Sequence, residues 1–212
     1  MNTIMNDMVT TIVAKVGSSS LVDLYNLKQS CKSLYEVGQD DYIFKTVSME
    51  KIPVNPWTSL SKEAAFFLQR CQETENPEAL FRLGMIEYFS HGEVELGRVF
   101  LEKATYFGHI EASYVLGIVL VCTATATDSK TILKGVELLK SAIRFKKVSR
   151  KRTQSILKAM WLRHFIQLPQ GSVCSDPNCS KNIRRMPDNK GWPTVLEDDY
   201  IDAEEVADCD AC

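Results

Sequence analysis

Apolar residues near the N-terminus recur every three or four positions, the spacing that places them along one face of an α-helix. In residues 5–16 this face consists of Met5, Met8, Val9, Ile12, Val13 and Val16. Gly17 is predicted to end the helix, and Ser20 to cap the next one, with Asp23 in the capping-box position. The inner face of that second helix is predicted to consist of Leu21, Leu24 and Leu27. Its apolar pattern continues to Gly38, a natural helix end.

Two prolines within the segment PVNPW, residues 53–57, interrupt the helical pattern. Proline cannot donate a backbone hydrogen bond and it restricts the residue before it, so no helix is expected to continue through this segment. We therefore divide the chain into an N-terminal module of residues 1–50, a linker of residues 51–60 and a second helical region of residues 61–168. The remaining residues, 169–212, form an acidic tail that contains cysteines.

A repeat is visible within the second region. Residues 79–84, ALFRLG, match residues 112–117, ASYVLG, and residues 97–104 match residues 135–142. The chain therefore contains two helical hairpins of about 35 residues each. The first hairpin has a strong start signal, because Asn76 supplies a cap that is followed by a proline and an acid. Its first helix is predicted to end at His91-Gly92.

Small residues at matching positions of the repeat are predicted to let the paired helices approach closely: Gly84, Gly117, Ala104 and Ala142. Because such units bury their faces only by stacking, flanking helices over residues 61–71 and 153–166 are predicted to cap the stack. Strand signals are nearly absent, with no sustained alternation and no Asn-Gly or Asp-Gly hairpin turn. The predicted fold class is all-α: an N-terminal three-helix module, a short stack of helical hairpin repeats and an irregular C-terminal tail.

Composition excludes several classes of protein. Apolar residues make up 45% of the chain, enough for a buried core, and the formal net charge of −2 creates no long-range attraction to nucleic acid or membrane. No apolar run is long enough to span a bilayer. The N-terminal segment contains Asp7 and no early Lys or Arg, unlike a signal peptide. His91, His109 and His164 share no motif, and phosphate-binding loops and nucleophile elbows are missing from the sequence, so we expect no enzyme.

The first 47 residues resemble an F-box. That family pattern opens with Leu-Pro and continues with three spaced leucines, a small segment containing Cys-Lys, and a short aspartate-led helix with an aromatic residue. This chain has Leu21, Leu24 and Leu27, then Cys31-Lys32, then Asp40-Asp41-Tyr42-Ile43-Phe44 at those positions. At the opening, Ile4-Met5 stands where Leu-Pro is usual, and Thr11 stands where an acid is usual.

The repeat, with its Leu-Gly pair in the first helix and a late Ala in the second, resembles the Sel-one-like class of helical repeats, which are relatives of the tetratricopeptide repeat. An F-box, such repeats and then a cysteine cluster is an order found in a group of plant F-box proteins. The C-terminal part of those proteins is sometimes a MYND-type zinc finger, of which the cysteine cluster here resembles a degenerate form.

The resemblance implies a non-catalytic substrate-recognition subunit of an SCF-type cullin-RING ubiquitin ligase, with an unknown protein substrate held by the repeats. The residues assigned to binding of the adaptor subunit are Ile4, Met5, Met8, Val9, Ile12, Val16 and Lys32, whereas Leu24 and Leu27 are assigned to the internal core. A module of about 45 residues is too small to bury all its apolar faces internally, which favours a partner. The alternative is a helical-repeat interaction scaffold whose F-box has decayed.

Four of the seven cysteines lie in the tail, at Cys174, Cys179, Cys209 and Cys212. Zinc takes four thiolates tetrahedrally, and the two residues between the last pair match the spacing of a zinc site. The tail is therefore either a knuckle around one structural zinc or a solvated acidic segment with free thiols. Cys31, Cys71 and Cys122 lie in apolar helical patterns and are predicted to be reduced core residues. Reduced thiols and the F-box resemblance together imply a cytoplasmic or nuclear location.

Six of the nine residues 144–152 are basic. This run is predicted to be a solvated turn between helices, and the alternatives are a surface for RNA, for an acidic substrate or for a nuclear import receptor. It has no interleaved aromatic residues apart from Phe145, so nucleic acid is not an expected partner. It also has the charge to neutralise the acidic tail, which carries eight acids and no base from Val195 onward.

Overall fold

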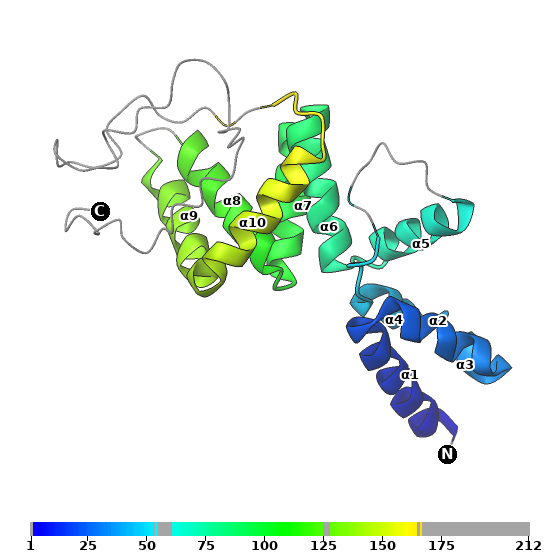
Figure 1. Ribbon diagram of the computed structural model, residues 1–212. Coiled ribbons are helices and arrows are strands. Elements are labelled where there is room, and N and C mark those ends of the chain that lie inside the picture. The colour runs from blue at the N-terminus through cyan, green and yellow to red at the C-terminus, as the bar shows by residue number, and fades with distance from the viewer. Residues whose placement is uncertain (1, 53, 55–60, 125–127, 165, 167–212) are drawn as a thin grey trace. The chain divides into compact units, whose positions relative to one another are not determined.

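Every regular element in the part of the chain that the structure describes is a helix, as the sequence predicts. The computed structural model describes residues 2–164, apart from residues 53, 55–60 and 125–127, and also residue 166; for residues 2–6, 144, 146 and 147 only the backbone is described. Residues 1–164 make up one compact unit (Figure 1). None of the described helices is both long and apolar enough to cross a membrane.

Four helices form the N-terminal module: α1 (Asn2–Ser19), α2 (Leu21–Ser30), α3 (Lys32–Val37) and α4 (Asp41–Thr46). The Ser20 hydroxyl caps α2 by accepting a hydrogen bond from the Asp23 N–H at 3.2 Å, as predicted. Leu24 is buried, and Leu21 and Leu27 pack against the same cluster, which confirms their assignment to the core. The same cluster includes side chains of α1, α4 and the segment that follows it, and it continues into α5 and α6: Val13, Ala14, Ile43, Phe44, Val47, Met49, Ile52, Phe67, Cys71 and Ala79.

The predicted continuous apolar pattern from Leu21 to Gly38 is divided into two helices at Cys31, so the module has four helices rather than three. Cys31 adopts an extended conformation, with φ −159° and ψ 159°, and ends α2 as it begins α3. Its side chain is exposed, so its predicted place in the core is wrong. The reason is that a residue between two helices belongs to the buried face of neither. Cys71 is buried as predicted, and Cys122 is half-buried.

The repeat region begins with α5 (Lys62–Glu73) and continues with two hairpins. The first pairs α6 (Pro77–Met85) and the π-helix η1 (Ile86–His91) with α7 (Val94–Tyr106), and the second pairs α8 (Ile110–Thr123) with α9 (Ser129–Ala142). Glycines sit where the paired helices touch. A Cβ atom on Gly117 would lie 3.0 Å from the Gly135 oxygen, and one on Gly84 would lie 3.0 Å from the Leu101 nitrogen. The predicted close approach at small residues is thus confirmed.

The last described helix differs from its prediction. The short η2 (Ile143–Phe145) leads directly into α10 (Lys146–Lys158), so most of the basic run lies inside a helix and not in a turn. The buried face of α10 consists of Ser149, Thr153, Ile156 and Leu157, and Met160, just beyond the helix, is also buried. Two of these residues carry hydroxyl groups, which concealed the start of the buried face in the sequence. The helix also ends at Lys158 rather than near residue 166, and this leaves Trp161 exposed beyond it.

Residues beyond α10 contact the π-helix. The Phe89 carbonyl of η1 accepts hydrogen bonds from the backbone N–H groups of Arg163 at 2.8 Å and His164 at 3.1 Å. The His164 ring also meets the buried Tyr88 ring edge to face, with 5.0 Å between centroids. Gly92 then ends η1 with a left-handed φ of 83°, which confirms the predicted helix end. These contacts tie the end of the described chain to the first hairpin.

Candidate functional site: an exposed face of α1 and a buried polar junction

The first helix presents apolar side chains to solvent as well as to the core. Val13 and Ala14 are buried, whereas Met8 is 62% exposed and Ile12 is 59% exposed. Val9 is half-buried and packs against the core cluster, and Val16 is also half-buried. Two of the residues assigned to adaptor binding are therefore free to meet a partner without any change in the core.

The other assigned residues are placed less directly. Lys32 begins α3, and its side chain is 91% exposed, with its nitrogen 3.8 Å from a Glu36 carboxylate oxygen. Such an exposed ion pair is weak and does not hold the lysine away from a partner. The side chains of Ile4 and Met5 lie outside the described residues. The exposed face that the structure describes thus consists of Met8 and Ile12, with Lys32 on a helix that packs against α1.

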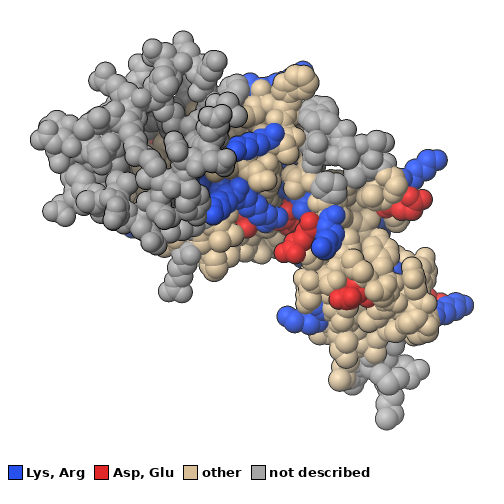
Figure 2. All heavy atoms as spheres, viewed as in Figure 1, with Lys and Arg blue, Asp and Glu red and all other residues tan. Residues whose placement is uncertain are grey.

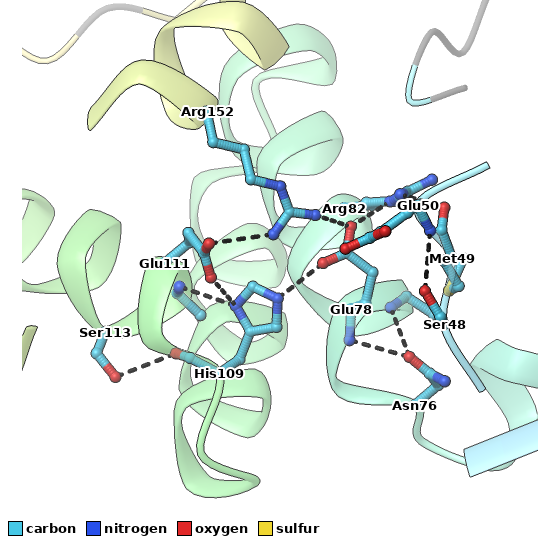
Figure 3. A network of polar contacts seen from close by, with 12 residues as sticks. Ser48, Met49, Glu50, Asn76, Glu78, Arg82, His109, Glu111, Ser113 and Arg152 are labelled. Atoms are coloured by element: carbon cyan, nitrogen blue, oxygen red, sulfur yellow. Dashed lines mark hydrogen bonds and ion pairs between the residues drawn. The ribbon is translucent and has the colours of Figure 1, made fainter. Parts of the chain in front are cut away.

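A second candidate site is a group of buried and half-buried charged side chains between α6, α8 and α10 (Figure 3). Glu78 of α6 is its centre. One of its carboxylate oxygens accepts hydrogen bonds from Arg82 at 2.5 Å and Arg152 at 2.6 Å, and the other lies 2.9 Å from Nε2 of His109. Arg152 also reaches Glu111 at 3.2 Å. Each helix of the group therefore contributes at least one charge that another helix neutralises.

Both ring nitrogens of His109 form hydrogen bonds. Its Nδ1 atom accepts a hydrogen bond from the Ala112 N–H at 3.1 Å and so caps α8. The proton therefore sits on Nε2 and is donated to Glu78. The ring also stacks on Phe81, with 4.6 Å between centroids. Sequence reasoning identified His109 only as a residue at a helix end, because its partners are distant along the chain.

Side chains of the repeat region also bind the end of the N-terminal module and Ile52 just after it. Arg82 donates hydrogen bonds to the carbonyls of Met49 and Ile52, both at 2.8 Å. Asn76 donates to the carbonyls of Phe44 at 2.9 Å and Val47 at 3.1 Å, while its side-chain oxygen caps α6. Four backbone carbonyls of residues 44–52 thus depend on two buried side chains of the repeat region. The cap at Asn76 was predicted from the sequence, but this second role was not.

The charged groups of the junction stabilise the packing of the helices that carry them. Burial by itself raises the pKa of Glu78, but the hydrogen bond from His109 and the charges of Arg82 and Arg152 outweigh burial and lower that pKa to about 2. The carboxylate is therefore ionised at any physiological pH and is fully paired. A paired carboxylate of this kind has no proton to exchange with a substrate, so the junction gives no support to a catalytic role.

We predict that acid weakens the fold through Glu78. Its pKa falls from an ordinary value of 4.5 to about 2 on folding, so its contribution to stability is complete above pH 4.5 and is lost as the pH falls towards 2. One pKa unit corresponds to about 1.4 kcal/mol, so the free energy of unfolding should fall by about 2 kcal/mol between pH 6 and pH 3 through this residue alone. Urea unfolding at both pH values measures the change. Glu78→Gln should show a correspondingly smaller difference, and an equal difference in both proteins would contradict the prediction.

The proposed metal ligands Cys174, Cys179, Cys209 and Cys212 lie outside the described residues. Within the described part of the chain, no group of three or more His, Cys, Asp or Glu side chains is arranged to hold a metal ion. Burial raises the pKa of Cys71 to about 12, against an opposing effect of Arg82, so this thiol stays protonated and is unsuited to bind metal.

A stack of helical hairpins preceded by a small helical module defines a helical-repeat protein. The chain belongs to the family of plant tetratrico peptide repeats, whose sequence profile matches residues 49–160. This match covers α5 to α10 and also includes Met49 and Ile52, whose carbonyls Arg82 binds.

Three related proteins of Arabidopsis thaliana carry F-box names. The chain is 36% identical to "Putative F-box protein At1g67623" over 138 residues, which are 65% of this chain and 44% of that protein. It is 29% identical to "F-box protein At2g35280" over 147 residues, 68% of this chain and 88% of the relative. It is 28% identical to "F-box protein At1g67340" over 123 residues, 56% of this chain and 32% of the relative. The chain thus spans less than half of the first and third relatives. No solved structure matches it.

These relationships confirm the predicted kinship with plant F-box proteins that carry helical repeats. The assignment of the repeats to the Sel-one-like class and the likeness of the tail to a MYND-type finger stay predictions.

Proposed function

We propose that this protein is the substrate-recognition subunit of an SCF-type cullin-RING ubiquitin ligase. The N-terminal module docks on the adaptor subunit, and the helical repeats hold a protein substrate. Other subunits supply the chemistry, so the chain itself is not an enzyme. Its place of action is the cytoplasm, the nucleus or both.

The observation that carries the proposal is the exposed apolar pair Met8 and Ile12 on a helix whose other side, at Val13 and Ala14, is buried in the core. Burial of each side chain on a partner would contribute about 1.5–3 kcal/mol before the costs of ordering. The F-box names of the relatives indicate which kind of partner to test first. The polar junction supports the proposal in a second way, because a receptor must hold its substrate at a set position relative to the adaptor.

Co-purification of the full chain with the adaptor subunit tests the proposal. We expect a stable complex of the two proteins on size-exclusion chromatography. A wild-type chain that elutes alone at micromolar concentrations of both proteins would contradict the proposal. It would favour the alternative, a repeat scaffold with a decayed F-box, for which the unusual Ile4-Met5 and Thr11 are the supporting observation.

We also propose that the four tail cysteines hold one structural zinc ion. The support is the donor set itself, because four thiolates complete a tetrahedral zinc site. Metal analysis of the purified protein should find one zinc per chain. The double variant Cys209→Ser, Cys212→Ser should lose it, and the exposed Cys31→Ser should keep it as a control. If wild-type protein expressed in zinc-supplemented medium contains no zinc after purification, the proposed site is ruled out.

A further inference from the structure

One stretch of the chain carries positive charge alone. Between Lys140 and Arg163 the sequence contains nine Lys and Arg residues and no Asp or Glu. The structure places most of this stretch on α10. Lys and Arg side chains gather along this helix on the face that Figure 2 shows.

The packing of α10 directs its charges outwards. The buried face is uncharged and packs towards α8, so Arg150, Lys151 and Lys158 are exposed. Arg152 is different, because Glu78 and Glu111 both bind it in the junction. Among the described residues, no ion pair joins Arg150 or Lys158 to a carboxylate.

Apolar side chains are also exposed on α10 and on η2 just before it. Val148 of α10 is 63% exposed, and Ile143 and Phe145 of η2 are also exposed. A partner that covers this surface would gain both ion pairs and apolar burial. An acidic segment of a protein, with aliphatic residues between its carboxylates, has the matching chemistry.

A nucleic acid fits the same surface less well. Single strands bind by stacking successive bases on aromatic rings between the cations. The exposed rings here are Phe145 and Trp161, which lie beyond opposite ends of α10. A helix of 13 residues is about 20 Å long, so these rings are too far apart for neighbouring bases.

We propose that the exposed side of α10, defined by Val148, Arg150 and Lys158, binds an acidic segment of a partner protein. The identification of that partner as the ubiquitination substrate rests on the proposed function. The binding surface itself does not.

A labelled peptide of about ten residues, with Asp or Glu alternating with Leu, is the probe for the full chain. We expect fluorescence anisotropy to show binding that weakens with salt, because exposed ion pairs are screened. The double variant Arg150→Glu, Lys158→Glu should bind at least about 10-fold more weakly, since the loss and reversal of two charges remove about 1.4 kcal/mol or more. The matched control is Lys51→Glu, Lys62→Glu, which makes the same charge change at exposed lysines away from α10. It should stay within about twofold of wild type.

Equal weakening in both double variants would overturn the proposal, because the attraction would then reflect total charge and not this surface. Single-stranded RNA that binds more tightly than the peptide, and loses that binding in the α10 variant, would also overturn it in favour of a nucleic acid. Adaptor capture by the same protein preparations separates this proposal from the proposed function. Peptide binding without adaptor capture supports the binding surface on α10 and contradicts the ligase assignment. Adaptor capture without peptide binding supports the ligase assignment and contradicts the binding surface.

Discussion

Replacing Arg82 with Met will lower the free energy of unfolding by about 3–5 kcal/mol, the usual cost of removing one partner from a buried ion pair. Arg82 is 7% exposed and contacts the Glu78 carboxylate and the carbonyls of Met49 and Ile52. Methionine keeps an unbranched apolar side chain but donates no hydrogen bond, so both carbonyls lose their donor and Glu78 loses one of its cations. For a chain of this size the melting temperature should fall by about 10 °C.

The matched control is Arg70→Met. Arg70 also forms an ion pair between two helices, with Asp41, but its side chain and that of its partner are 31% and 74% exposed. Solvent replaces lost contacts at such a site, so the expected loss is about 1 kcal/mol or less. Urea unfolding of both variants compares them directly. If the free energy of unfolding falls equally in the two variants, Arg82 does not contribute the extra stability that its buried contacts indicate.

Replacing Ile12 with Asp will weaken adaptor binding by at least about 30-fold, or 2 kcal/mol, while the fold stays intact. The physical reason is that a carboxylate at the centre of an apolar contact must lose its hydration without gaining a partner. Because Ile12 is 59% exposed in the free protein, the same change removes little from the core. Surface plasmon resonance with immobilised adaptor measures the affinity, and thermal unfolding verifies the fold.

Leu133→Asp is the control for this substitution. Leu133 lies on α9 in the repeat region and is 62% exposed, so the change in chemistry and exposure is the same at a site away from the N-terminal module. Its affinity for the adaptor should equal that of wild type. If Ile12→Asp binds as well as Leu133→Asp does, the adaptor does not use the exposed side of α1.

Features that depend on neighbouring residues were predictable. The caps at Ser20 and Asn76, the helix end at Gly92 and the close approach at Gly117 all follow from local hydrogen bonding or from the absence of a side chain. The repeat was visible because equivalent positions of two hairpins face equivalent surroundings. The positions of the helices can therefore be predicted from sequence patterns that extend over only a few residues.

Predictions failed where the buried face was not apolar or where a helix was interrupted. Ser149 and Thr153 are polar residues on the buried side of α10, so the helix start was placed too late. Cys31 follows the helical spacing but occupies a break between α2 and α3. Hydropathy does not reveal either case, because it reports the chemistry of a side chain and not its surroundings.

The exposed side of α1 was predicted only in part from the sequence. Periodicity identified Met8, Ile12 and Val13 as one apolar face, but did not show which part of that face would stay uncovered. Packing of α1 on the other helices of the module buries Val13 and leaves Met8 and Ile12 outside. Their role in adaptor binding remains a prediction that the Ile12→Asp experiment decides.

By itself the sequence determined the helical class and the positions of most caps, because each depends on residues within one or two helical turns. The tertiary structure alone decided the buried junction. Glu78 and Arg152 are 74 positions apart, and Arg82 reaches carbonyls 30 and 33 residues away. A charged residue that will be buried looks the same in a sequence as one that will be solvated, and only the folded chain brings its partners together.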